Sequence, residues 1–211
     1  MRRLILVVLV LLAASPGGCT PKNAVMRAPA LFAAADTDPY AQAPPDERAT
    51  TIDIFYATDR VRKSDIISSI KDYGAERGRD LRLGVATVAL GRGPETWDAL
   101  ADETLARKRR QTIPITVACL EEHGFLGSTV LSFDPRFGDP KNEEAQHRWI
   151  AELNARLAES VSRDLYIFVS PFKITFEQGL LIAAQFHLFT GRTGVSLCYS
   201  WPTNLGTLDY L

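Results

Sequence analysis

Cysteine, histidine and net charge are all scarce in this sequence of 211 residues, which contains 3 Cys and 3 His and carries a formal charge of −1. A charge so close to zero supplies no basic field, so we predict no nucleic-acid partner. The few cysteines and histidines form no C-x-x-C pair and no mixed cluster, and we therefore predict neither a metal nor a cofactor. The remaining composition, 46% apolar and 23% charged residues, is typical of a globular domain.

Long apolar runs are also lacking, apart from the one between Leu4 and Ala14. That run has about eleven residues, whereas a helix needs roughly 20 to cross a bilayer. Arg2 and Arg3 precede it and small residues follow it, as in a secretory signal peptide. The sequence therefore predicts that residues 1–18 direct export and that the mature chain lies outside the cytoplasm.

Cys19 follows two glycines at the end of this run and resembles the lipobox cysteine of bacterial lipoproteins. The resemblance implies acylation of Cys19, a membrane surface as partner, and a place on the periplasmic side of the bacterial cell envelope. Plain secretion, with Cys19 incidental, is the alternative. The next stretch, residues 19–50, is rich in Ala, Pro, Thr and Asp, and its composition predicts a flexible tether.

Residues 51–211 carry the patterns of a folded domain that begins with a β-rich segment. Alternating and β-branched runs predict short strands, and the polar stretch 61–80 predicts a surface loop or a short helix. Pro114 indicates that one strand starts there or lies at a sheet edge. The four predicted strands span residues 52–57, 84–90, 113–120 and 129–133.

A helix and then a β-α-β unit follow in the second half of the domain. Asp139 and Pro140 predict the start of the helix, whose buried face would hold Trp149, Ile150, Leu153, Leu157 and Val161. The nearly continuous apolar run 164–170 predicts a central parallel strand covered on both faces. Thr175 and Gln178 predict a capping box for a helix to about Phe189, and residues 195–200 predict the next strand. The fold class is therefore α/β, mostly parallel in this C-terminal part.

Two strings in the domain resemble one known family. They are Ile54-Phe55-Tyr56-Ala57-Thr58-Asp59-Arg60 and Tyr199-Ser200-Trp201-Pro202, supported by Tyr73-Gly74, Arg77-Gly78, Leu83-Gly84, Phe176-Glu177, Gly206 and Tyr210-Leu211. With them, residues 52–211 resemble the N-terminal half of an uncharacterised family of bacterial α/β-hydrolases, which are often lipoproteins. The resemblance implies a serine esterase or lipase-like ancestry and a partial α/β-hydrolase-like sheet, so that residues 51–211 would form an incomplete domain of that type.

This sequence departs from the family pattern in two places, both among the residues that would take part in catalysis. The family's oxyanion turn reads His-Gly-aromatic-Asn, whereas here the turn reads Ser170-Pro171-Phe172-Lys173, and Pro171 has no N–H to donate. No G-x-S-x-G elbow occurs, and the nearest string, residues 194–198, lies inside a predicted strand. The family's nucleophile, acid and histidine would all follow Leu211. We therefore assign no catalytic residue and expect this chain to be inactive.

Two alternatives to an inactive hydrolase-like protein stay open. The chain could be part of an active serine hydrolase whose nucleophile half is missing here, or a binding or scaffold domain of the cell envelope. A Ser170–Lys173 dyad is a weaker possibility, because Pro171 intervenes and no second oxyanion donor is evident. The sequence does not identify a substrate or a protein partner.

The remaining reactive side chains fit structural roles better than chemical ones. We expect Cys119 and Cys198 to be buried free thiols, with a single disulfide as the alternative. His147, near Glu143 and Glu144, is expected on a solvated helix surface, and His123 in a loop. His187 falls on an apolar helix stripe, where a hydrogen-bonded or partly exposed histidine is expected.

Overall fold

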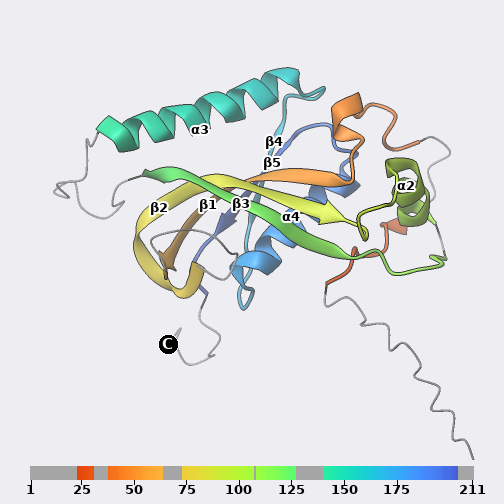
Figure 1. Cartoon of the computed structure of the whole chain (residues 1–211), viewed down its shortest axis with the longest axis horizontal. Helices are drawn as coiled ribbons and strands as arrows, with labels where there is room; N and C mark the ends of the chain where they lie inside the picture. Colours follow the sequence, from red (N-terminus) through yellow and green to blue (C-terminus); the bar gives the residue numbers. More distant parts are fainter. Residues whose placement is uncertain (1–22, 31–37, 64–72, 107, 127–139, 204–211) are drawn as a thin grey trace, which may run out of the picture.

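The computed structural model describes residues 23–30, 38–63, 73–106, 108–126 and 140–203, and these form a mixed α/β fold. Five strands make one sheet, and three α-helices pack around it (Figure 1). The elements are η1 Pro45–Glu47, β1 Thr51–Arg62, β2 Tyr73–Leu90, α2 Trp97–Leu105, β3 Ile115–Leu126, α3 Pro140–Glu159, β4 Leu165–Val169, α4 Phe176–Phe189 and β5 Val195–Ser200.

The sheet has the strand order β3-β2-β1-β5-β4, with β1 at its centre. β1, β2 and β3 pair antiparallel, whereas β1 pairs parallel with β5, and β5 pairs parallel with β4. The predicted parallel β-α-β unit is confirmed as β4-α4-β5. Pro114 immediately precedes β3, an edge strand, as its position predicted.

Helices cover the two faces of the sheet over different strands. On one face, α4 packs Leu180 and Ala184 against Ile54 and Tyr56 of β1. On the other, α3 lies across the antiparallel strands and buries Trp149 against Phe55, with ring centroids 5.6 Å apart (Figure 1). Alternate residues of β1 therefore enter opposite cores, which is why its whole central part is apolar.

The capping-box prediction for α4 and the start of α3 are both confirmed. Thr175 accepts a hydrogen bond from the backbone N–H of Gln178, whose side chain accepts one from the N–H of Thr175. α3 begins at Pro140 and buries Trp149 and Leu153. The predicted buried face is wrong at Ile150 and Val161, which are 45% and 56% exposed.

The strand lengths differ from the prediction, most of all in β2. Residues 73–80, expected in a loop or short helix, form the first part of a strand that runs to Leu90. Their charges and glycines are untypical of a strand, so the sequence did not predict one here. The glycines allow close contact with β1, because a Cβ at Gly78 would lie 3.0 Å from the carbonyl oxygen of Arg60. The strand predicted at 129–133 lies outside the described residues.

β4 is an edge strand, whereas its apolar sequence predicted a central one. On its outer side it pairs with no described strand. Its residues facing the α3 side of the sheet stay exposed, with Ile167 at 60% and Val169 at 56%. An apolar run indicates that a strand can be buried on both faces of a sheet. It does not indicate whether other strands pair with it on both sides.

Part of the predicted tether packs against the domain. Within residues 38–50, the side chain of Tyr40 is 1% exposed and its ring lies 4.9 Å from that of Trp97. Further back, Val25 is buried and its N–H donates to the carbonyl of Ile113. The packed body therefore includes residues well before position 51.

Candidate functional site

The carboxyl ends of the parallel strands β1, β5 and β4 meet at one edge of the sheet. In open α/β sheets, ligands bind outside this edge. Here the edge brings together Arg60 at the end of β1, Ser200 and Thr203 after β5, and Ser170 after β4. The first turn of α4 and the start of β2 complete the surroundings, so this region is the candidate site.

Ser170, the first residue of the altered oxyanion turn, is buried rather than presented to a ligand. It is 2% exposed, and its Oγ lies 3.9 Å from the Sγ of Cys198. Its backbone N–H donates to the carbonyl of Tyr199. Gly179 of α4 closes the other side, where an added Cβ would lie only 2.6 Å from Ser170 Oγ. The hydroxyl is therefore enclosed between β5 and α4.

The rest of the turn offers little to an oxyanion. Pro171 carries no N–H, and Phe172 is 42% exposed. Lys173 adopts a left-handed φ of 64°, and its Nζ lies 5.5 Å from the centre of the Phe172 ring. Among the described residues, no hydrogen bond joins Ser170 Oγ to a lysine, so the Ser170–Lys173 dyad does not form.

The three histidines all lie elsewhere. His187 is near the end of α4, about 12 Å along the helix from Gly179 at about 1.5 Å per residue. His187 is 3% exposed, so it is not the partly exposed residue that was one expectation. Its Nε2 contacts the Glu47 carboxylate, in keeping with the other expectation, a hydrogen-bonded histidine, whereas its Nδ1 has no hydrogen-bond partner in the described part of the chain. His123 belongs to β3, not to a loop, and lies 3.6 Å from Glu152. His147 is exposed on α3, while Glu144 pairs with Arg148.

The two described cysteines are free thiols in different environments. Burial raises the pKa of the Cys198 thiol to about 12, despite its contact with Ser170, so this thiol stays protonated at neutral pH. Cys119 is exposed on β3, which corrects the expectation that both are buried. Cys19, the predicted lipidation site, lies outside the described residues.

Arg60 is the residue at this edge that sequence reasoning missed. It is 2% exposed, and its guanidinium donates to Ser200 Oγ at 2.9 Å and to Thr203 Oγ1 at 3.1 Å. It also donates to the carbonyls of Gly74 and Ile174, and so joins β1, β2, the turn before α4 and the segment after β5. From the sequence, a charged residue at the end of a strand is expected to be exposed. The partners that bury Arg60 could not be predicted, because they lie up to 143 positions away in the sequence.

A cavity of about 180 Å³ opens beside the Arg60 guanidinium. We call it the Arg60 cavity. Its described lining residues are Arg60, Lys63, Tyr73, Gly74, Ala75, Ile174, Thr175, Phe176 and Thr203.

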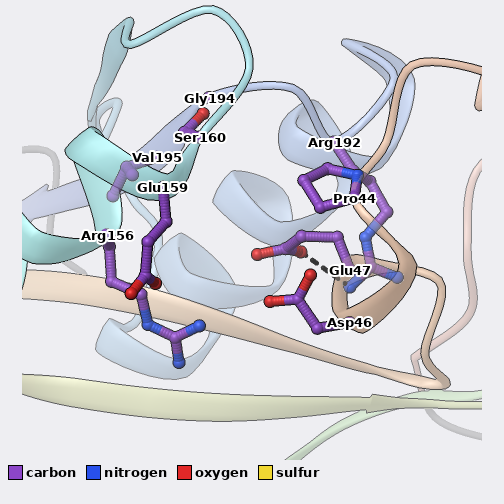
Figure 2. A pocket seen from close by; sticks show the side chains of 9 residues that line it. All are labelled: Pro44, Asp46, Glu47, Arg156, Glu159, Ser160, Arg192, Gly194 and Val195. Carbon is purple, nitrogen blue, oxygen red and sulfur yellow. Dashed lines mark hydrogen bonds and ion pairs between the residues drawn. The ribbon is translucent and has the colours of Figure 1, made fainter.

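A second polar cluster surrounds the other end of α4 (Figure 2). Arg192, just after the helix, points at Glu47 of η1, and its Nη2 lies 3.2 Å from Glu47 Oε2. Arg192 also donates to the carbonyls of Ala49 and Thr51, and His187 Nε2 lies 3.7 Å from the same carboxylate. Burial would raise the pKa of Glu47, but His187 and Arg192 together hold it below its usual value. This cluster fastens the segment before β1 to the domain.

Comparisons of this chain with protein-family models, with curated proteins and with solved structures gave no match. Among the described residues, no three His, Cys, Asp or Glu side chains are grouped as a metal site would require. Within the same residues, none of the helices has the length and apolar character to cross a membrane. The functional assignment therefore rests on the geometry of the candidate site.

Proposed function

We propose that this chain is an exported, lipid-anchored protein of α/β-hydrolase type whose own residues do not catalyse ester hydrolysis. The environment of Ser170 carries the proposal. A serine nucleophile needs an exposed hydroxyl, a base within hydrogen-bond distance and donors for the developing oxyanion. Ser170 is enclosed by Cys198 and Gly179, and the next residue, Pro171, has no N–H.

Hydrolysis of a short-chain p-nitrophenyl ester tests the absence of catalysis. The full chain, kept soluble in detergent, should release p-nitrophenol no faster than the Ser170→Ala variant does. Ser170→Ala is the matched control, because it removes only the hydroxyl. The smaller side chain also fits in the narrow space beside Gly179. Turnover by the natural chain that Ser170→Ala abolishes would refute the proposal.

The exposed side of β4 favours a second candidate function, in which another polypeptide supplies the nucleophile half of an active hydrolase. Exposed apolar side chains on an edge strand favour pairing with another chain, and β4 exposes Ile167 and Val169. A neighbouring reading frame that encodes G-x-S-x-G would be the partner to co-express. Co-purification with new esterase activity would support this candidate, and neither would occur if the chain acts alone.

The proposed anchor has its own test in the full chain. Replacing Cys19 with Ala removes the thiol that would be acylated, and the protein should move from the membrane fraction to the soluble fraction. Several acyl chains together hold firmly to a bilayer, at about 0.8 kcal/mol for each buried CH₂. Unchanged membrane association of Cys19→Ala would remove lipidation from the proposal.

A further inference from the structure

Residues 23–26, shortly after the proposed lipidation site, are docked on the folded body. The carbonyl of Asn23 accepts a hydrogen bond from the N–H of Ile115 at 3.2 Å. Two residues later, the N–H of Val25 donates to the carbonyl of Ile113 at 2.9 Å. The backbone of this segment therefore pairs with the chain at the beginning of β3.

Two side chains of the body hold the same segment. The guanidinium of Arg109, which follows α2, donates to the carbonyls of Val25 and Met26. The Gln185 side chain of α4 accepts a hydrogen bond from the N–H of Met26 at 2.6 Å. Val25 is 4% exposed and belongs to the core on the α4 side of the sheet. Three parts of the domain that lie far apart in the sequence thus fix the position of this segment.

The docking limits how far the domain can lie from Cys19. Cys19 and Asn23 are four residues apart, and an extended chain spans at most about 3.6 Å per residue, so their Cα atoms lie within about 14 Å of each other. A free tether over residues 19–50 would have a root-mean-square length of about 30 Å. When acyl chains on Cys19 enter a bilayer, Asn23 is therefore held close to the lipid headgroups.

The side of the domain nearest to Cys19 consists of residues 23–27 and the beginning of β3, and we call it the anchor face. Its exposed side chains include Met26, which is 50% exposed, together with Arg27 and Thr116. An apolar thioether beside a basic side chain with an apolar stem suits the interfacial layer of a bilayer. The composition of the anchor face therefore agrees with the position that the short tether imposes.

The beginning of β2 lies far from the anchor face. Thr116 of β3 pairs with Ala89 of β2. Arg79 precedes Ala89 in the same strand and is separated from it by roughly 33 Å, at about 3.3 Å per residue. In Figure 1 the beginning of β2 and residues 23–30 lie on opposite sides of the molecule. Positions 116 and 79 therefore differ in their distance from the proposed anchor.

We propose that the docked residues 23–26 hold the domain against the membrane surface that carries the anchor, with the anchor face toward the lipid headgroups. The proposal rests on the acylation of Cys19 proposed above. It replaces the flexible tether predicted over residues 19–50 with a short connection that ends at Asn23. The partner of the anchor face is the lipid surface itself.

Fluorescence quenching tests this orientation in the acylated chain. The processed protein would be reconstituted into vesicles of phosphatidylcholine and phosphatidylglycerol that contain a lipid with a nitroxide on its headgroup, which quenches only nearby fluorophores. A fluorophore is attached to Thr116→Cys or, as the matched control, to Arg79→Cys. Both positions are exposed, and both variants carry Cys119→Ser, because Cys119 is an exposed free thiol. The label at position 116 should lose most of its fluorescence, and the label at position 79 should keep it. Equal quenching at the two positions, or none at either, would overturn the proposal.

A matched pair of insertions tests the role of the docked segment. A Gly-Ser linker of about 24 residues between Lys22 and Asn23 gives the connection to Cys19 a root-mean-square length of about 30 Å, so the label at position 116 should escape most of the quenching. The same linker between residues 34 and 35 follows the docked segment and should leave the quenching unchanged. Equal effects of the two insertions would show that residues 23–26 do not hold the domain at the membrane.

The outcomes separate this inference from the proposed anchor. Unchanged membrane association of Cys19→Ala, or absence of the natural chain from the membrane fraction, would overturn the anchor and this inference together. Membrane association that Cys19→Ala abolishes, combined with equal quenching at positions 116 and 79, would overturn this inference alone.

Discussion

The two ends of α4 carry polar clusters of opposite character. At its end near residue 189, the Glu47 carboxylate meets Arg192 and His187, and Arg192 is further used by two backbone carbonyls. At its beginning, the Arg60 guanidinium donates to two hydroxyls and two carbonyls, and Arg60 and Lys63 both line a cavity. The first cluster is balanced within the protein and joins segments. The second joins the ends of β1 and β5 to the turn before α4, and it borders that cavity.

Both clusters join segments that lie far apart in the sequence, but they do so with different partners. Removing one member of a buried, hydrogen-bonded group of polar side chains leaves the others unpaired and is strongly destabilising, whereas an exposed ion pair contributes little. The hydrogen bonds of Arg60 hold the sheet edge together, and its side chain also lines the cavity. Substitutions at the two ends should therefore change different properties.

Loss of the Arg60 guanidinium should have the largest effect on stability. Arg60→Met leaves Ser200, Thr203 and two carbonyls without their donor in a buried place, and we expect a loss of about 3–5 kcal/mol in the free energy of unfolding. Urea unfolding followed by circular dichroism measures it.

Arg77→Met is the matched control for Arg60→Met. Arg77 lies opposite Arg60 in the β1–β2 register, but its side chain is 68% exposed. Its ion pair with Asp59 should contribute at most about 1 kcal/mol. Equal destabilisation by the two variants would contradict the structural role of the Arg60 hydrogen bonds.

Loss of Arg192 should loosen the segment before β1. Arg192→Met removes the donor to Ala49 and Thr51 and the closest partner of Glu47, so we expect a loss of about 2–4 kcal/mol and faster tryptic cleavage after Arg48. Mass spectrometry of the digest identifies the cleavage.

Arg156→Met provides the comparison for Arg192→Met. Arg156 lines the same small pocket in Figure 2, but it is 38% exposed and pairs with Asp53. Cleavage after Arg48 should keep its natural rate in this variant. An unchanged rate in Arg192→Met as well would show that the cluster does not hold this segment.

The Glu47 carboxylate should give the cluster a dependence on pH. Its pKa is lowered in the folded protein, so its contribution to stability is complete above the unfolded-state pKa, about 4.3, and is lost as the pH falls through the folded-state value. Glu47→Gln should therefore cost about 1–2 kcal/mol at pH 7 and progressively less below about pH 4. Urea unfolding at several pH values measures the difference. A difference that does not change with pH would contradict the charged pairing.

The second half of the fold could be predicted from patterns of adjacent residues. The first half could not be predicted fully, because its strands depend on contacts between residues far apart in the sequence. The capping box of Thr175 and Gln178 and the apolar run before it are read from adjacent residues, and they correctly predicted β4-α4-β5. The position of β4 at an edge depends on its neighbours, which its own sequence does not encode. The charged start of β2 was missed because its strand character comes from pairing with β1.

The candidate site was predictable only in part. The altered turn at Ser170 and Pro171 was evident from the sequence, and the missing N–H of proline indicated the loss of one oxyanion donor. The burial of Ser170 depends on Gly179 and Cys198, which approach it through the packing of α4 on β5. The Arg60 cavity combines side chains from residues 60 to 203, and no local pattern in the sequence marks it.

A fluorophosphonate probe, which reacts covalently with activated serine hydroxyls, tests the central claim most directly. The full chain would be incubated with the probe, and peptide mass spectrometry would then locate any adduct. We predict no adduct at Ser170, because its hydroxyl is buried between Cys198 and Gly179 and no base bonds to it among the described residues. An adduct at Ser170 in the folded protein, absent after denaturation, would contradict the account.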